Sequence, residues 1–335
     1  MYTFYLLKNK QKLTISFITL RGLKMAKLPF PTASIKEEKN NILHFPVLDL
    51  NGNLIAQEGA PLSKQFFWKI IRVAPQPKPF IPVEGLPTLW SDLNKAISDL
   101  PYQKLFQKTK TKTQLEDLLK IAQLSSFIID GLNFFKEKDP YTYWHSLHVF
   151  ILTGYMAMEL IRQPDWVRHF AVMGPLHDIG KINVSLEILK KKTLLTRKEL
   201  QRLRHHTVAG AILLNHFHGE KDLLGPTVAL EHHERLDGSG YPFGVPISNP
   251  IVEMVAICDV YDALISPRPY RNRPFDLRTG LELLTQLAVK GKFSTDTLRF
   301  MISLHRKGKP DYKKVAFSLE ARGTPPEENV YGLFD

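Results

Sequence analysis

Histidines and aspartates gather in the middle of this 335-residue chain in a pattern that could bind metal ions. Ten of the 12 histidines fall between His145 and His233. Several stand beside a second histidine or an aspartate, and one aspartate follows on a later segment: His177, Asp178, His205, His206, His232, His233 and Asp259. Neutral imidazole and carboxylate together suit iron, manganese or zinc better than magnesium or calcium. Burying so many ionisable groups without a metal would be costly, so the pattern predicts a metal site.

Apolar helical segments must position these residues. From Tyr141 to about Leu304 the apolar spacing is helical almost throughout, with only short loops. Each candidate ligand lies at or near an end of such a segment, so a helix bundle could direct them all to one place. Taken alone, a single histidine is more often a helix-surface or capped core residue, and this applies to His148, His169, His205, His216 and His218. The adjacent pairs and the two aspartates favour the metal interpretation.

The first part of the chain has a different pattern. Two apolar runs flank Asn51-Gly52-Asn53, which predicts a hairpin, and Leu62 to Val73 predicts a short amphipathic helix. Five prolines between residues 74 and 88 predict an extended linker or a rigid loop. Helical spacing then resumes at 89–100 and at 115–136. We therefore expect a mainly α protein that divides into a small α/β module at 25–88, a helical connector at 89–138, an all-helical domain at 139–310 and a tail at 311–335.

The net charge of +12 is unevenly distributed. Residues 1–24 contain five Lys or Arg and no acidic residue, and Met25 opens a stretch that reads like a natural protein start. Residues 1–24 show no small-residue cleavage site, so we do not expect a signal peptide. Because of the protein-like start at Met25, we expect them to be a disordered or untranslated extension. Cys258 is the only cysteine, which excludes an intramolecular disulfide and predicts a reducing, cytoplasmic location. No run approaches the roughly 18 apolar residues that a membrane span needs.

Five motifs occur in an order that resembles the HD-GYP phosphodiesterases. They are HDIGK at 177–181, His-x-x-x-Gly at 206–210, HHERLDGSGYP at 232–242, DVYDAL at 259–264 and RPYR at 268–271. The resemblance runs from about Tyr141 to Leu304 and implies that the helical domain is a catalytic HD domain. It further implies two or three metal ions, usually iron or manganese, and the bacterial second messenger cyclic di-GMP as substrate.

The resemblance also implies which residues bind the metals. His145 matches the first ligand of the family and would form one metal site with three later residues: His177, Asp178 and Asp259. The second site would consist of His206, His232 and His233, with Asp178 bridging the two ions. Some family members hold a third metal through a Glu one helical turn before the first histidine. Tyr141 stands at that position here, so we expect two metals and not three.

Catalysis would then follow from charge. Two close metals lower the pKa of a bridging water and neutralise the phosphodiester oxygens. Asp178 and Lys181 would be the catalytic residues, with the Lys181 ammonium on a non-bridging phosphate oxygen. The resemblance assigns substrate contacts to Arg268, Arg271 and Tyr241 of the GYP loop. From spacing alone, Lys181 could equally be a helix-end lysine, the arginines a solvated basic loop and the loop glycines a tight turn.

Two acidic residues inside the HHERLDGSGYP motif, and the N-terminal module, give weaker indications of function. Glu234 and Asp237 are interpreted as partners that orient histidines. The module could regulate the enzyme or bind a protein partner, as could the GYP loop, or the module could be a passive packing unit. We expect no DNA partner, and a homodimer is a further expectation.

Three functions compete. The leading one is hydrolysis of cyclic di-GMP to linear pGpG, or on to GMP. The alternatives are an HD hydrolase of another nucleotide and a non-catalytic cyclic-dinucleotide receptor. Intact candidate ligands argue against the receptor.

Overall fold

The computed structural model describes the chain over the following residues: 41–75, 79–99, 102–106, 109–161, 164–219, 224–268, 271, 273–308 and 310–327. The predicted extension at 1–24 and the last part of the predicted tail, 328–335, lie outside these residues.

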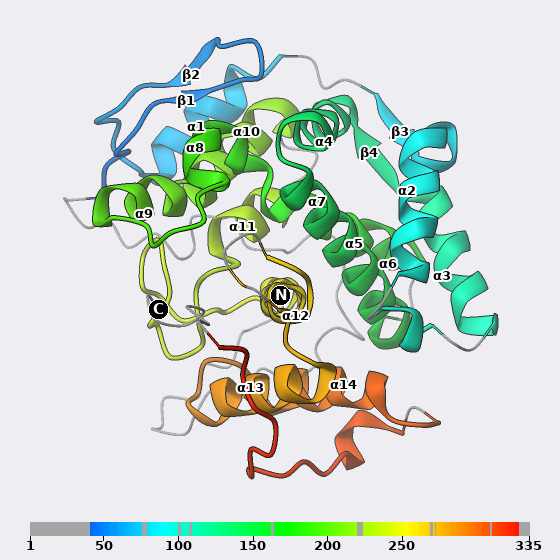
Figure 1. Cartoon of the computed structure of the whole chain (residues 1–335). Helices are drawn as coiled ribbons and strands as arrows, with labels where there is room; N and C mark the ends of the chain where they lie inside the picture. Colours follow the sequence, from blue (N-terminus) through cyan, green and yellow to red (C-terminus); the bar gives the residue numbers. More distant parts are fainter. Residues whose placement is uncertain are drawn as a thin grey trace, which may run out of the picture.

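A buried helix, α12 (Pro250–Ile265), lies at the centre of the molecule, where Figure 1 shows it almost end-on. Asn249 caps its first turn by accepting a hydrogen bond from the Ile251 N–H, and Pro250 occupies the first helical position, where no N–H is needed. Each residue from Ile251 to Ile265 is buried, because helices cover α12 on several sides.

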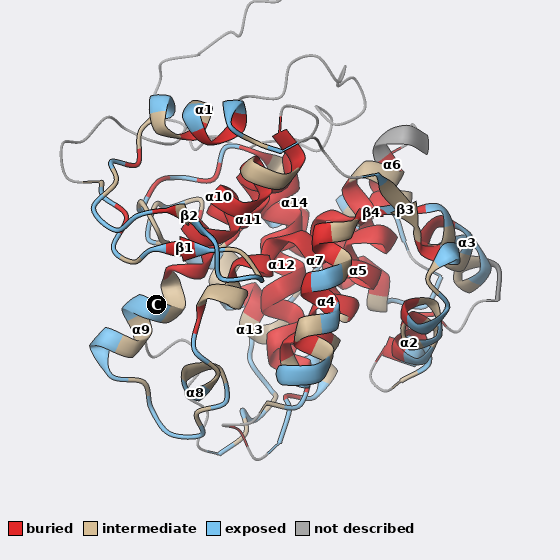
Figure 2. Ribbon diagram, turned by 90° about the horizontal axis from the view of Figure 1, so that it is seen from above, coloured by how far each residue is buried: buried red, intermediate tan, exposed pale blue. Residues whose placement is uncertain are grey.

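Helices that pack directly on α12 or on one another form the bundle around it: α5 (Pro140–Leu160), α6 (Pro164–Ala171), α7 (Met173–His177), α10 (His206–His218), α11 (Leu224–Glu231), α13 (Leu277–Val289) and α14 (Thr295–His305). Figure 2 shows that the buried residues concentrate in the central helices α5, α7, α11 and α12. Shorter elements complete this part of the chain: η6 (Ile179–Asn183), α8 (Leu186–Leu189), α9 (Arg197–Arg204) and η8 (Tyr312–Lys314). The expected all-helical domain is confirmed.

The N-terminal module contains the predicted hairpin and helix. Strands β1 (Val47–Leu48) and β2 (Leu54–Ala56) pair antiparallel. The Asp49 carboxylate accepts hydrogen bonds from the backbone of Asn51 and Asn53, which fixes the turn between them. Helix α1 (Lys64–Arg72) is capped by Ser63. The module packs on α10, so it covers one side of the helical bundle.

The connector differs from the sequence-based expectation. Two elements precede the expected boundary at residue 88, β3 (Phe80–Pro82) and η4 (Val83–Gly85). The elements that follow are α2 (Pro87–Ser98), η5 (Tyr102–Lys104), α3 (Thr109–Ile121), β4 (Gln123–Ser125) and α4 (Ser126–Lys138). The expected single helical stretch at 115–136 is therefore wrong, because β4 interrupts it. Pairing of β4 with β3 draws this backbone out of the helix, and the Ser125 hydroxyl then caps α4 by accepting from the Ile128 N–H.

One continuous apolar core joins the three segments. It extends from Leu43 in the module through Leu93 and Leu124 in the connector to Leu264 in α12 and Val315 beyond α14. The β3–β4 pair crosses the expected boundary at residue 88 in the same way. Among the described residues, no helix is both long enough and apolar enough to cross a bilayer.

Candidate metal centre

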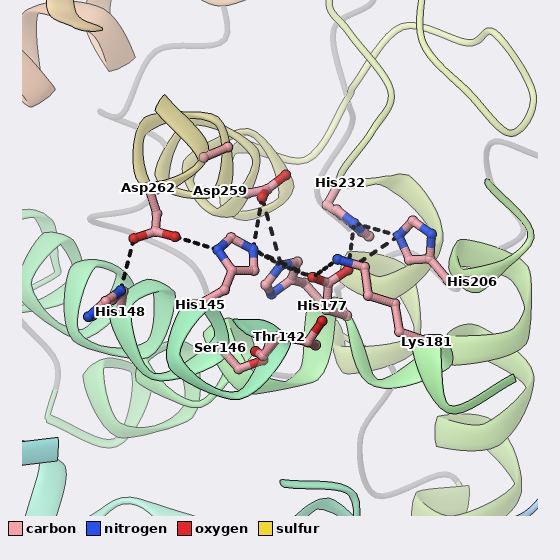
Figure 3. Close-up of polar contacts among 12 residues, drawn as sticks. Thr142, His145, Ser146, His148, His177, Lys181, His206, His232, Asp259 and Asp262 are labelled. Carbon is pink, nitrogen blue, oxygen red and sulfur yellow. Dashed lines mark hydrogen bonds and ion pairs between the residues drawn. The ribbon is translucent and has the colours of Figure 1, made fainter. Parts of the chain in front are cut away.

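Five separate segments contribute side chains to one buried site, shown in Figure 3. His145 comes from α5 and Asp259 from α12, and a third contribution comes from the turn between α7 and η6. That turn supplies His177 and Asp178. The start of α10 and the end of α11 supply the rest: His206, His232 and His233. The structure thus brings all seven predicted ligands together.

Two glycines allow the backbones to approach closely enough for this assembly. A Cβ on Gly174 would lie 2.5 Å from backbone atoms of Phe150, so only glycine lets α7 lie against α5 at this point. A Cβ on Gly180 would lie 1.9 Å from the His206 carbonyl oxygen. The glycine of HDIGK therefore permits the Asp178 turn to contact the first turn of α10.

The candidate ligand atoms form two neighbouring groups. In the first, the His145 Nε2 lies 3.1 Å from Asp259 Oδ1 and 3.3 Å from the His177 Nε2. In the second, the Nε2 atoms of His206 and His232 are 3.3 Å apart. One donor atom from each of His206, His232 and His233 lies within 4.8 Å of the other two, and the same holds for the first group.

Asp178 lies between the two groups. Its Oδ2 is 3.2 Å from the His177 Nε2, and its Oδ1 is 3.4 Å from the His206 Nε2. The Oδ1 atom is buried and has no hydrogen-bond partner among the described residues. A buried carboxylate oxygen without a partner is costly, and a bound cation would remove that cost. This oxygen and the surrounding imidazoles fit a site for divalent metal ions.

Backbone carbonyls orient three of the histidines. The Nδ1 of His177 faces the Gly174 carbonyl, that of His206 lies 2.6 Å from the Leu203 carbonyl, and that of His232 lies 3.0 Å from the Val228 carbonyl. A carbonyl only accepts, so Nδ1 must carry the proton in each ring. The Nε2 lone pair is then left to face the site, as a metal ligand requires.

The carboxylate of Asp262 orients His145 instead. Sequence reasoning did not identify Asp262 as a site residue. The Asp262 Oδ2 lies 2.5 Å from the His145 Nδ1. The other Asp262 oxygen accepts from Tyr102 and Ser266 and lies 3.1 Å from the His148 Nδ1. Asp262 follows Asp259 by three residues, so the DVYDAL motif places both carboxylates on one face of α12. That spacing was the available signal.

Burial and local charge set the protonation of the site. Burial lowers the pKa of His206 to about 4 and holds those of His232 and His233 well below the ordinary value. These three rings are neutral at pH 7 and ready to bind a cation. Burial also acts against charge on His145, yet bonds to Asp259 and Asp262 raise its pKa to about 10. Without a metal, the first group therefore holds a proton that the second does not.

The two acidic ligands stay ionised. Burial alone would raise the pKa of Asp178, but Lys181 and His177 hold it well below its usual range. Burial likewise opposes ionisation of Asp259, whose hydrogen bond with His145 lowers its pKa to about 2. Both carboxylates therefore carry negative charge at neutral pH.

The predicted substrate contacts lie at different places. The Lys181 Nζ is 2.5 Å from Asp178 Oδ2, inside the site. The Tyr241 ring stacks on His233, with centroids 4.5 Å apart. The Arg268 guanidinium lies over the Tyr141 ring, 4.5 Å from its centroid, and Tyr141 is itself parallel to His145 at 6.2 Å. These side chains therefore reach the metal ligands directly or through one ring.

Arg271 has a different environment from the predicted one. It is only 6% exposed, and its Nη2 donates to the carbonyls of Ala263, Leu264 and Ser266. These are the last carbonyls of α12, which a basic side chain commonly satisfies at a helix C-terminus. Arg271 thus ties the RPYR segment to the end of α12.

The sequence suggested that Glu234 and Asp237 orient histidines, but their hydrogen bonds in the described part of the chain go elsewhere. The Glu234 carboxylate accepts from the backbone N–H groups of Phe243 and Val245, at 2.7 and 3.0 Å. Asp237 accepts from the Ser239 backbone and hydroxyl. Both acids therefore bind within the segment that carries the GYP motif. They shape the loop that places Tyr241.

Comparison with known proteins gives related sequences over this part of the chain. Residues 132–293 match the family model described as HD domain. Over 222 residues the chain is 34% identical to "Cyclic di-GMP phosphodiesterase" of Thermotoga maritima, a match that covers 63% of this chain and 57% of that protein. It is 42% identical over 138 residues to "Cyclic di-GMP phosphodiesterase PA4108" of Pseudomonas aeruginosa, covering 41% and 33%.

A further relative carries a different substrate in its name. The chain is 33% identical over 176 residues to "3'3'-cGAMP-specific phosphodiesterase 1" of Vibrio cholerae, covering 52% of this chain and 38% of that protein. In each of these three matches the chain spans less than two thirds of the relative's length.

Proposed function

We propose that this chain, whose residues 132–293 belong to the HD domain family and carry the HD-GYP motifs, is a metal-dependent phosphodiesterase that hydrolyses cyclic di-GMP. The observation that carries the proposal is the Asp178 carboxylate, which lies between two histidine groups and has a buried oxygen without a partner. The names of the relatives from Thermotoga maritima and Pseudomonas aeruginosa support the substrate.

The donor set supports two metal ions. One would be held by His145, His177 and Asp259, the other by His206, His232 and His233, with one Asp178 oxygen toward each. Imidazole and carboxylate favour iron or manganese. Bound there, the ions would supply a water of lowered pKa and positive charge for the phosphodiester oxygens.

The chain's own residues would bind and orient the substrate. Lys181 is held at the site by Asp178, and its ammonium would donate to a non-bridging phosphate oxygen. Arg268 would contact a second phosphate oxygen, because its guanidinium lies over Tyr141 at the edge of the ligand group. Arg271 would support that arrangement through the end of α12. The Tyr241 ring, stacked on His233, would form one wall for the substrate.

Hydrolysis would yield linear pGpG, or continue to GMP. The relative named for 3'3'-cGAMP makes a second cyclic dinucleotide the specific alternative. A receptor without turnover is the other alternative, and a receptor would not need the intact ligand set.

The test combines metal analysis with product chromatography. Full-length protein loaded with iron(II) or manganese(II) should convert cyclic di-GMP to pGpG or GMP, and faster than it converts 3'3'-cGAMP. Replacing His177 and Asp178 together with Ala should abolish both hydrolysis and the loading of two ions, because His177 belongs to the first group and Asp178 lies between the two. The matched control is His169→Ala, a histidine of α6 outside the site, which should leave both unchanged. Metal content that survives the double replacement would contradict the assignment.

A further inference from the structure

A cavity of about 510 Å³ lies beside the metal centre, outside the set of predicted ligands. Its walls come from the N-terminal module, α9, the first turn of α10 and the GYP loop, and include His44, Arg197, Arg204, His205 and Tyr241. This volume is within the roughly 300–1,000 Å³ of typical small-molecule sites. The lining residues thus come from three stretches far apart in the sequence, 41–62, 197–208 and 241–243.

The cavity suits an anion that carries an apolar body. No residue among its described lining is acidic, whereas Arg197 and Arg204 bring two guanidinium groups. Guanidinium binds phosphate through several parallel hydrogen bonds. Leu43 and Phe243, with Leu200 between the two arginines on α9, add an apolar surface on which a planar ring could pack.

His205 gives an independent indication of a ligand. The residue is only 8% exposed and lines the cavity, and its Nε2 has no hydrogen-bond partner within the described part of the chain. Its ring packs edge-on against Phe45, with centroids 5.4 Å apart, so its position is held by the module. A buried imidazole nitrogen without a partner is costly unless a ligand supplies one.

Tyr241 separates the cavity from the metal ligands. The Tyr241 ring stacks on His233 at 4.5 Å and an interplanar angle of 18°. The Arg204 guanidinium lies 4.7 Å from the centroid of the same ring. A molecule held by Arg204 would therefore be one aromatic ring away from a candidate metal ligand.

We propose that this cavity binds a nucleotide, with its phosphate on Arg197 and Arg204 and its base against the apolar wall. A nucleotide combines the two properties that the cavity requires, a compact anion and a planar ring. The site adjoins the metal centre through Tyr241 but shares no predicted metal ligand with it.

Binding is tested with GMP as the probe on the full chain carrying Asp178→Asn, which weakens the metal centre and removes hydrolysis. Isothermal titration calorimetry should show saturable binding of GMP and weaker binding of inorganic phosphate. Arg204→Met and His205→Leu should each weaken GMP binding about tenfold or more, since each removes a polar contact. Arg197→Met, at an exposed position of α9, provides a third variant if the others fold poorly.

The matched control is Arg202→Met. Arg202 lies on the same helix, but its guanidinium packs over Phe45 and it does not line the cavity. It should leave GMP binding unchanged. The proposal is overturned if GMP does not saturate, if phosphate binds as tightly as GMP, or if Arg202→Met weakens binding as much as Arg204→Met.

Two sources of the nucleotide can be distinguished with metal-loaded, unmodified protein. If the cavity takes one half of a dinucleotide substrate, GMP should inhibit competitively and Arg197→Met should raise KM. If the cavity takes a free nucleotide, GMP should change kcat without competing. The calorimetric result does not depend on hydrolysis. Loss of the proposed phosphodiesterase activity would therefore not contradict nucleotide binding in the cavity, and absence of GMP binding would not contradict the activity.

Discussion

Tyr141 stands where some of the HD-GYP phosphodiesterases that this sequence resembles hold a third metal through a Glu. Its ring lies parallel to the candidate ligand His145 and under the Arg268 guanidinium. Its hydroxyl is buried and has no hydrogen-bond partner among the described residues. A phenol of ordinary pKa near 10 is a poor metal ligand at pH 7, so the position favours two ions.

We predict that Tyr141→Glu raises the metal content from about two ions per chain to about three, because it places a carboxylate one turn before His145. Anomalous diffraction from metal-replete crystals measures the occupancy of each ion. Tyr141→Phe is the control and should still hold two. Three well-occupied ions in the unmodified protein would show that another residue replaces the Glu.

At the scale of elements, the connector reaches the metal centre through a hydrogen bond. Tyr102 in η5 donates to Asp262 in α12, and Asp262 orients the Nδ1 of His145. Tyr102 also stacks on His148, with ring centroids 4.5 Å apart. The connector therefore takes part in fixing a candidate ligand as well as in packing.

We predict that Tyr102→Phe weakens metal binding about tenfold, because partners that orient metal-binding histidines typically change affinity by factors of 10–100. Competition with a metal-sensitive chelator would measure the affinity. Tyr143→Phe is the matched control, since its hydroxyl bonds to Asp92, 2.6 Å away, and not to Asp262. Equal metal affinity in Tyr102→Phe and unmodified protein, with only a lower melting temperature, would leave Tyr102 a packing residue.

Sequence patterns predicted these elements unevenly. The hairpin at Asn51-Gly52-Asn53 and the helices that carry the ligands followed from local signals, turn residues and apolar spacing. The break at β4 did not, because it depends on pairing with a strand more than 40 residues earlier. The spacing of Asp262 from Asp259 was a local signal, but its contact with Tyr102, 160 residues away in the chain, could not be predicted. Contacts of this kind have no local signature.

Arg271 shows a related limit of motif reasoning. The phosphate contact that the RPYR motif implied for Arg271 stays a prediction, and the structure adds hydrogen bonds from its Nη2 to the carbonyls at the end of α12. Its position just after an apolar helix was a signal for capping. A motif gives the residue type at a site, and the neighbouring backbone decides what that side chain contacts.

At the scale of the whole molecule, buried histidines outside the metal centre affect stability. His305 at the end of α14 packs edge-on against Tyr261, with centroids 5.3 Å apart, and burial lowers its pKa to about 4. Above the unfolded pKa of about 6.5, the ring is neutral in both states and contributes no pH dependence. Below it, the unfolded chain binds a proton that the folded chain does not, so stability falls as the pH drops from 6.5 to 4.

We predict that His305→Phe removes this part of the acid sensitivity. The loss avoided would be no more than about 3 kcal/mol, since each pKa unit corresponds to about 1.4 kcal/mol and the ring is partly exposed. Urea unfolding at pH 8 and at pH 4.5 gives the free energy of unfolding for each protein, with pH 8 as the internal control. An equal fall in stability for both proteins between these values would contradict the prediction.

The continuous apolar core affects how the chain unfolds and whether its N-terminal module can be exchanged. Leu43 in the module and Val315 beyond α14 belong to one buried cluster, and the module packs on the helix that begins with His206. Elements that share a core lose it together, so unfolding should be a single cooperative transition in which module and metal centre disappear at the same denaturant concentration. The module is therefore unsuited to replacement by another domain. A replacement domain would need an apolar face that packs on α10 as well as its own regulatory function.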